Sequence, residues 1–217
     1  VWIPLFSPLF SLHADDIHVS GADSTVSVQD VRQALAPQVG QSLVSLNLEE
    51  MGHEVTDALV RVRSVRVTRN WPRGVDVALT LRVPVAVRQV EGGYELLDGD
   101  AVVLGTVGEA PAGLATIVTP QGESLTGEQV SAVAVAIGAL DPAVRAQVVS
   151  GTASATGQVS LSLASGSTVV WGDTTDLALK ARVLTQLLGA RSASVYDVSA
   201  PRSPVTAGEA TPTPTAP

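Results

Sequence analysis

Residues 65–87 constrain the fold of this chain more than any other stretch. Hydrophobic side chains alternate with polar ones over residues 65–68 and again over residues 75–82, a period of two that is typical of half-buried β-strands. The intervening turn contains Pro72, which fixes φ, and Gly74, which permits a positive φ. The sequence therefore predicts a β-hairpin with a defined reversal point.

The residues before this hairpin predict one strand and two helices. An alternating segment at residues 16–20 ends at Gly21. Ser27 and Asn47 stand where helix N-caps are expected, and hydrophobic residues follow each of them at helical spacing. We expect the order strand, helix, helix, strand, strand, with both helices on one face of a small sheet. Alternation resumes after Pro84, so that proline should mark the passage to a second domain.

The second half of the chain predicts a larger sheet with helices. Glycine-rich turns divide residues 85–118 into a meander of strands. Thr126 and Gln129 fit a capping box, and Asp141-Pro142 should close the helix that begins there. The further expected elements are strands at 146–150, 159–163 and 168–171, a helix at 175–188 and a final strand at 194–199.

The hairpin also carries a family signature. The runs Val65-x-Val67-x-Arg69-x-Trp71-Pro72 and Arg82-x-Pro84-x-Ala86 resemble those of the FtsQ/DivIB family of bacterial cell-division proteins. Further marks follow in the same order along most of the chain: Ile17-x-Val19-x-Gly21, Gly40-x-Ser42-Leu43, Leu97-Asp98, Gly166-x-x-Val169-x-x-Gly172, Lys180 and Asp197-Val198-Ser199-x-Pro201.

This resemblance implies an α+β protein in two parts. A POTRA domain, which places two helices on a three-stranded sheet, would precede a mixed, mostly antiparallel β domain with helices. Gly21, Arg69, Trp71, Pro72 and Pro84 would be structural residues of the family motifs. The expected divisions are the end of a transmembrane or membrane-proximal segment at 1–13, the POTRA domain at 14–84, the β domain at 85–206 and a disordered tail rich in proline and threonine at 207–217.

The first twelve residues carry no charge and are strongly apolar. They are too few to span a bilayer, which requires about 20 residues. An apolar strand or an exposed leader is one interpretation. The resemblance favours the outer end of a transmembrane helix with Trp2 near the interface. We therefore expect residues 1–12 to be poorly packed, with Phe6 and Phe10 outside the domain core.

Composition and motifs argue against several classes of function. A net charge of -8 disfavours nucleic acid or anionic lipid as the main partner. His13, His18 and His53 are scattered, there is no cysteine, and no phosphate-binding loop or nucleophile elbow is present. We expect no enzyme activity, no cofactor, no metal site and no small-molecule substrate. A POTRA protein of the secretion or membrane-assembly class and a secreted enzyme remain as alternatives.

Two tryptophans and one strand complete these expectations. Trp71 should close the edge of the small domain, and Trp171 should lie in the core. In the resembling family the last strand and the helix before it bind the partner FtsB, within a complex that also contains FtsL. Here that strand would be an exposed sheet edge, open to pairing with another chain. The residues assigned to this binding are Lys180, Ser194, Val195, Tyr196, Asp197, Val198, Ser199 and Ala200.

Overall fold

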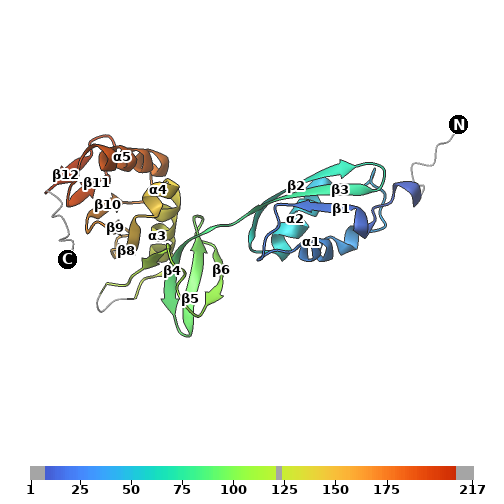
Figure 1. Ribbon diagram of the computed structural model, residues 1–217, viewed down its shortest axis with the longest axis horizontal. Coiled ribbons are helices and arrows are strands. Elements are labelled where there is room, and N and C mark those ends of the chain that lie inside the picture. The colour runs from blue at the N-terminus through green and yellow to red at the C-terminus, as the bar shows by residue number, and fades with distance from the viewer. Residues whose placement is uncertain (1–7, 121–123, 209–217) are drawn as a thin grey trace, which may run out of the picture. The chain divides into compact units, whose positions relative to one another are not determined.

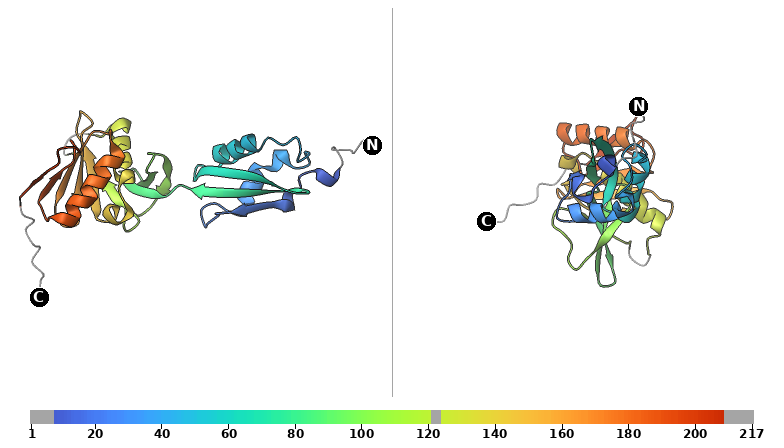
Figure 2. Two further views of the ribbon diagram at one scale, coloured as in Figure 1. Left: turned by 90° about the horizontal axis from the view of Figure 1, so that it is seen from above. Right: turned by 90° about the vertical axis from the view of Figure 1, so that its right-hand side faces the viewer.

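A computed structural model describes residues 8–120 and 124–208. The chain divides into two compact units between Arg82 and Val83, two residues before the boundary expected from the sequence. Figures 1 and 2 show the helices and strands of each unit. Pro84 is the first residue of the second unit's first strand.

The first unit has the expected order of strand, helix, helix, strand, strand. Its sheet runs β1-β3-β2, with β1 parallel and β2 antiparallel to the central β3. One hydrophobic cluster joins the buried residues of both helices to the inward side of the sheet, so the predicted α+β packing is confirmed. The elements are 3-10 turns at Pro8–Phe10, Ala14–Asp16 and Ala36–Gln38, strands β1 (Ile17–Ser20), β2 (Val62–Asn70) and β3 (Gly74–Leu81), and helices α1 (Val28–Ala34) and α2 (Leu48–Ala58).

Helix starts follow the capping residues read from the sequence. Ser27 and Asp30 form a reciprocal capping box at α1, and the Asn47 side chain accepts the amide hydrogens of Glu49 and Glu50 at α2. Each cap satisfies backbone donors that have no partner within the helix. These side chains therefore set where the helices begin.

Gly21 ends β1 in a conformation that side chains disfavour. Its φ is +81°, and a Cβ at this position would lie 2.4 Å from the carbonyl oxygen of Leu79. Gly40 has a similar φ of +89°, but a Cβ there would have no neighbour within 4 Å. Comparing these two glycines therefore distinguishes the cost of backbone strain from the cost of steric overlap.

We expect Gly40→Ala to lower the free energy of unfolding by about 1 to 2 kcal/mol, the usual cost of a left-handed alanine. Gly21→Ala should cost clearly more, because the β1–β3 pairing must also open to admit the methyl group. Chemical denaturation of both variants measures the difference. Equal losses of unfolding free energy in the two variants would show that the contact with Leu79 does not contribute to the cost.

The N-terminal segment is more ordered than predicted. Leu12 is fully buried in the core of the first unit, and backbone hydrogen bonds join Leu12 to Gly40 and Gln41, and Leu43 to Phe10. Phe10 is partly buried, while Phe6 lies outside the described residues. The expectation of a poorly packed segment is therefore wrong for residues 10–12, because an apolar, uncharged run gave no sign of which residue enters the core.

The second unit is built on one nine-stranded sheet of order β12-β11-β10-β9-β8-β7-β4-β5-β6. The three-residue β7 is parallel to both of its neighbours, β4 and β8. The strands are β4 (Pro84–Val90), β5 (Gly93–Asp98), β6 (Val103–Val107), β7 (Ala115–Ile117), β8 (Val148–Ala153), β9 (Val159–Leu163), β10 (Thr168–Gly172), β11 (Val195–Asp197) and β12 (Val205–Ala207), and the helices are α3 (Gly127–Ala139), α4 (Pro142–Arg145) and α5 (Leu177–Ala190).

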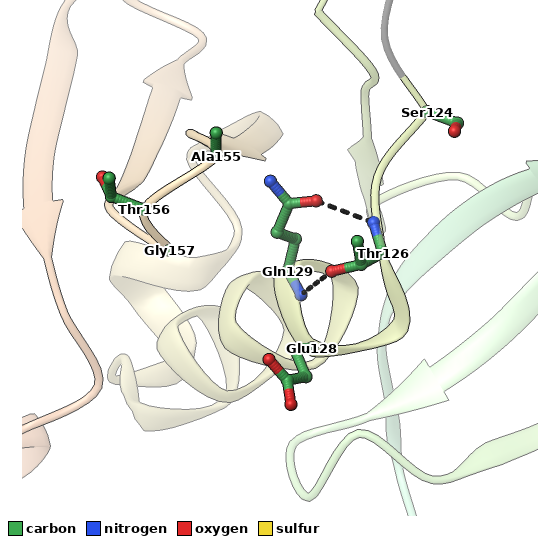
Figure 3. A pocket seen from close by; sticks show the side chains of 7 residues that line it. All are labelled: Ser124, Thr126, Glu128, Gln129, Ala155, Thr156 and Gly157. Atoms are coloured by element: carbon green, nitrogen blue, oxygen red, sulfur yellow. Dashed lines mark hydrogen bonds between the residues drawn. The ribbon is translucent and has the colours of Figure 1, made fainter.

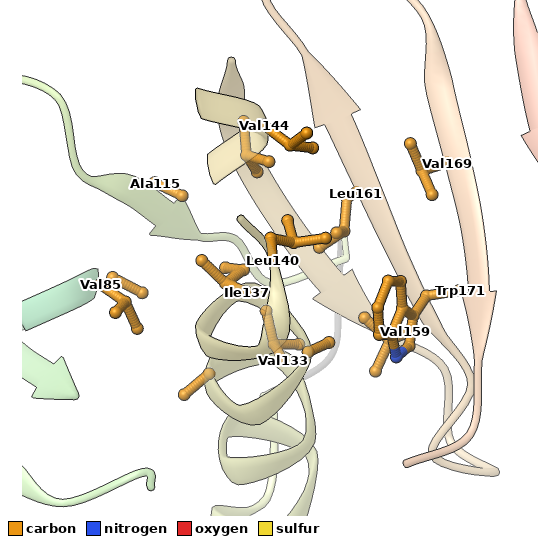
Figure 4. Close-up of a cluster of buried hydrophobic side chains, with 14 of the residues drawn as sticks. Val85, Ala115, Val133, Ile137, Leu140, Val144, Val159, Leu161, Val169 and Trp171 are labelled. Atoms are coloured by element: carbon orange, nitrogen blue, oxygen red, sulfur yellow. The ribbon is translucent and has the colours of Figure 1, made fainter. Parts of the chain in front are cut away.

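The main core of this unit lies between the sheet and its helices. Buried side chains of α3, among them Val133 and Ile137, face those of β8, β9 and β10, as Figure 4 shows. Trp171 has no exposed surface, which confirms its predicted place in the core. Asp141-Pro142 ends α3 as expected and also opens the short α4. Within the described ranges, no helix has the length and apolar character needed to cross a membrane.

Candidate partner-binding edge

The strand assigned to partner binding is not at the edge of the sheet. β11 pairs in parallel with β10 on one side and antiparallel with β12 on the other. The prediction that residues 194–199 form the free, final strand is therefore wrong. The missed strand, Val205–Ala207, has only three residues between a proline and a glycine, too few for alternation to reveal it. It also includes Ala207, which was expected to be the first residue of the tail.

The ladder shows which groups of β12 face outward. Ser194 accepts a hydrogen bond from Thr168, and Val198 donates one to Val170, so the N–H and C=O of Tyr196 between them point toward β10. Alternation then turns residues 195 and 197 toward β12, where they face Ala207 and Val205. Between these two bonded pairs, Thr206 must direct its N–H and C=O away from β11. Within the described part of the chain, no strand pairs with that side.

Most of the predicted binding residues instead support this edge from behind. The hydroxyl of the buried Tyr196 donates to the Arg191 carbonyl at 2.8 Å and accepts from the Ala193 amide at 3.0 Å. Ser194 donates from its side chain to the Ala207 carbonyl at 2.8 Å. These bonds tie the end of α5, β11 and β12 together. Val198 is buried, Val195 and Asp197 are partly exposed, and Ser199 and Ala200 are exposed.

Lys180 also differs from its predicted role. Its side chain is fully buried, and its ammonium group lies 2.8 Å from a carboxylate oxygen of Asp173 and 2.9 Å from the carbonyl oxygen of the same residue. The hydrogen bond from Lys180, together with one from Thr175, holds the pKa of Asp173 well below its usual range. This pair therefore stabilises the folded state fully above the ordinary carboxyl pKa, and the stabilisation is lost as the pH falls below that value.

Arg69, Trp71 and Pro72 lie at the turn end of the first unit's hairpin, whereas Gly21 lies beside Leu79, toward the other end. The Arg69 guanidinium donates to the carbonyl oxygens of Leu43 and Leu46 at 2.7 and 2.8 Å, which fastens the segment before α2 to β2. Trp71 is 54% exposed, so the expectation that it closes the domain edge is wrong.

Polar side chains at the start of α3 line a pocket, but they form the cap of the helix. A polar pocket of about 670 Å³ opens at the start of α3, and Figure 3 shows Thr126 and Gln129 bonded to each other there as the helix cap. Gln129 also donates to the Ser154 carbonyl, so these polar groups already have partners. Among the described residues, no cluster of three or more histidine, aspartate or glutamate side chains could hold a metal ion.

Comparison with known proteins gives one consistent answer for both units. A family model described as the POTRA domain, FtsQ-type, matches residues 12–81, and one for the C-terminal part of cell division protein FtsQ/DivIB matches residues 86–199. The cell division protein FtsQ of Streptomyces collinus is 32% identical over 208 residues, which cover 91% of this chain and 78% of that protein.

Two further relatives carry the same printed name. The protein of Streptomyces griseus is 32% identical, with 89% of this chain and 96% of the relative covered. The protein of Mycobacterium leprae is 32% identical, with 87% and 54% covered. The family models cover the hairpin motif and the first sheet, and the second sheet from β4 to β11. The chain therefore belongs to the FtsQ/DivIB family of cell-division proteins.

Proposed function

We propose that this protein is a non-enzymatic scaffold of the divisome that binds homologues of FtsB and FtsL on the outer side of the cell membrane. In this role it acts at the division septum and couples division to septal peptidoglycan synthesis. A single membrane helix on the N-terminal side of the 3-10 turn at Pro8–Phe10 anchors it, and residues 8–13 form the membrane-proximal segment that joins this helix to the first unit. The family membership supports a cell-division role, and the uncharged apolar N-terminal run supports the anchor.

The partner strand adds to the outer side of β12. The observation that carries this proposal is the position of β12 at the end of the nine-stranded sheet, with no described strand beyond it. Backbone groups on such an edge can continue the sheet into another chain. The sheet has a second edge at β6. We choose β12 because the resemblance implies that the partner binds at the last strand of the chain. Ser199 and Ala200, exposed in the connection before β12, then lie near the partner.

Proline substitution tests this edge. Thr206→Pro removes an amide hydrogen that faces outward, so it should abolish binding of an FtsB homologue while the unit stays folded. Thr206→Ala keeps the amide and should bind nearly as well as the unaltered protein. Isothermal calorimetry with an FtsB-derived segment gives the affinity, and circular dichroism reports folding.

Val205→Pro is the matched backbone control. Its amide faces Asp197 of β11, so proline there should detach β12 and lower the thermal stability as well as the binding. A folded Thr206→Pro protein with full affinity would exclude strand addition at this edge.

A further inference from the structure

The aromatic residues of this chain are unevenly placed. The sequence holds seven of them, three Trp, two Phe and two Tyr. Four belong to one end of the first unit or to the segment that enters it: Trp2, Phe6, Phe10 and Trp71. Phe10 and Trp71 touch edge to face, with ring centroids 6.0 Å apart and planes at 76°. Of the four, Phe10 and Trp71 lie within the described residues, and Trp71 is 54% exposed, so this pair is a candidate contact surface.

Two exposed apolar residues belong to the segments that meet at this aromatic pair. Leu9, which precedes Phe10, is 67% exposed, and Val44 is 45% exposed. Val44 follows Leu43, whose amide donates to the Phe10 carbonyl at 2.8 Å. We call Leu9, Phe10, Val44 and Trp71 the aromatic end. It projects from three separate segments of the chain.

Hydrogen bonds hold these segments in one fixed arrangement. The Gly40 amide donates to the Leu12 carbonyl at 2.8 Å, and the His13 amide donates to the Arg73 carbonyl in the hairpin turn at 3.2 Å. The Arg69 guanidinium adds its two bonds to the segment that carries Val44. The aromatic end is therefore a preformed surface whose members do not depend on a partner for their order.

The charges beside this end do not form a patch of one sign. Arg73 lies 3.9 Å from the carboxylate of Asp16, and Asp15 and His13 are close in sequence. A surface of this kind does not attract anionic ligands by charge. Tryptophan and phenylalanine at the rim of an apolar surface suit the boundary between lipid chains and headgroups, where an aromatic ring meets a polar layer.

We propose that the aromatic end rests on the outer face of the lipid bilayer, with Trp71 in the headgroup layer. We choose lipid as the partner because Leu9 and Phe10 follow residues 1–8 directly in the chain. Those residues carry no charge and include Trp2 and Phe6. The inference rests on the proposed membrane anchor. It adds that the anchored unit has a defined face toward the membrane, in contact with lipid through Trp71.

Quenching of tryptophan fluorescence by brominated lipid tests this contact. The 217-residue chain, with Trp2→Phe and an N-terminal histidine tag, is tethered to phosphatidylcholine vesicles that contain a nickel-chelating lipid. Trp71 and Trp171 then remain, and Trp171 is fully buried. Brominated phosphatidylcholine should quench a substantial part of the emission. The Trp2→Phe/Trp71→Phe protein should show almost no quenching.

Charge substitutions at two exposed apolar residues distinguish contact through the aromatic end from nonspecific adhesion of the protein to vesicles. Leu9→Asp should reduce the quenching of Trp71 at least two-fold. Val60→Asp should leave it unchanged, because Val60, although 51% exposed, precedes β2 and so lies at the opposite end of the hairpin from Trp71. Adding phosphatidylglycerol should alter the signal little. A strong increase in quenching would contradict the proposal, because it would show that attraction to anionic lipid brings Trp71 to the membrane.

Quenching of the Trp2→Phe protein no greater than that of the double variant would overturn the inference, and the surface would then be left for a protein partner. The lipid-free calorimetry of the Thr206 variants is independent of this result. If the protein binds the FtsB-derived segment but shows no quenching of Trp71, only the proposed membrane contact is contradicted. If Trp71 is quenched but the protein does not bind the segment, only the proposed scaffold role is contradicted.

Discussion

Leu79→Asp is expected to unfold the first unit, whereas Arg66→Asp should leave it folded. Leu79 is 9% exposed and belongs to the hydrophobic cluster beneath α1 and α2, while Arg66 is exposed on the opposite face of the neighbouring strand. An aspartate at 79 would be desolvated without a partner, at a cost of several kcal/mol. That cost is comparable with the whole stability of a small domain, about 5 to 15 kcal/mol.

Thermal melts followed by circular dichroism and limited proteolysis measure this difference. Proteolysis is needed because the two units can unfold separately. Val67→Asp should have a smaller effect than Leu79→Asp, since Val67 is only partly buried. Equal melting of the Leu79 and Arg66 variants would mean that the register is shifted by one residue, which exchanges the two faces of the strand.

Lys180→Glu should unfold the second unit for a related reason. The substitution replaces the buried ammonium group with a carboxylate beside Asp173, so the pair of opposite charges becomes two like charges. The Lys180 side chain is fully buried whereas that of Asp173 is 55% exposed, so the main cost is that of a carboxylate buried without a partner, several kcal/mol, and the repulsion adds to this. Urea denaturation should show an early transition of the second unit.

Arg182→Glu is the matched control for Lys180→Glu. Arg182 lies on the same helix and is exposed, so the same reversal of charge should change the stability by less than about 1 kcal/mol. A folded Lys180→Glu protein of unaltered stability that lost only its partner binding would support the assignment of Lys180 to the binding residues.

Local chemistry made much of the fold predictable. The caps at Ser27 and Asn47 and the alternation of the hairpin depend on neighbours within a few residues, and the structure places each of these where the sequence indicated. The burial of Lys180 depends on tertiary packing instead. One signal was nevertheless present, since Lys180 lies three residues after Leu177 and four before Leu184, within the inward stripe of the helix.

The edge of the second sheet was harder to predict, because it depends on strand order. Whether Tyr196 lies in a central or an outer strand is decided by a pairing that follows it in the chain. That pairing involves only residues 205–207, between Pro204 and Gly208. A segment of this length shows no periodicity, and Pro204 and Gly208 suggested a loop. The assignment was therefore displaced by one strand.

The brevity of β12 protects the protein from uncontrolled self-association. Long, flat edges invite copies of the same chain to stack into fibrils, and short edge strands that include proline are a common defence. With Thr206 alone between two inward-bonded residues, the edge presents too few groups to template a copy of itself. Under the proposed strand addition, a partner must therefore bring additional side-chain contacts of its own, and these would make the assembly selective.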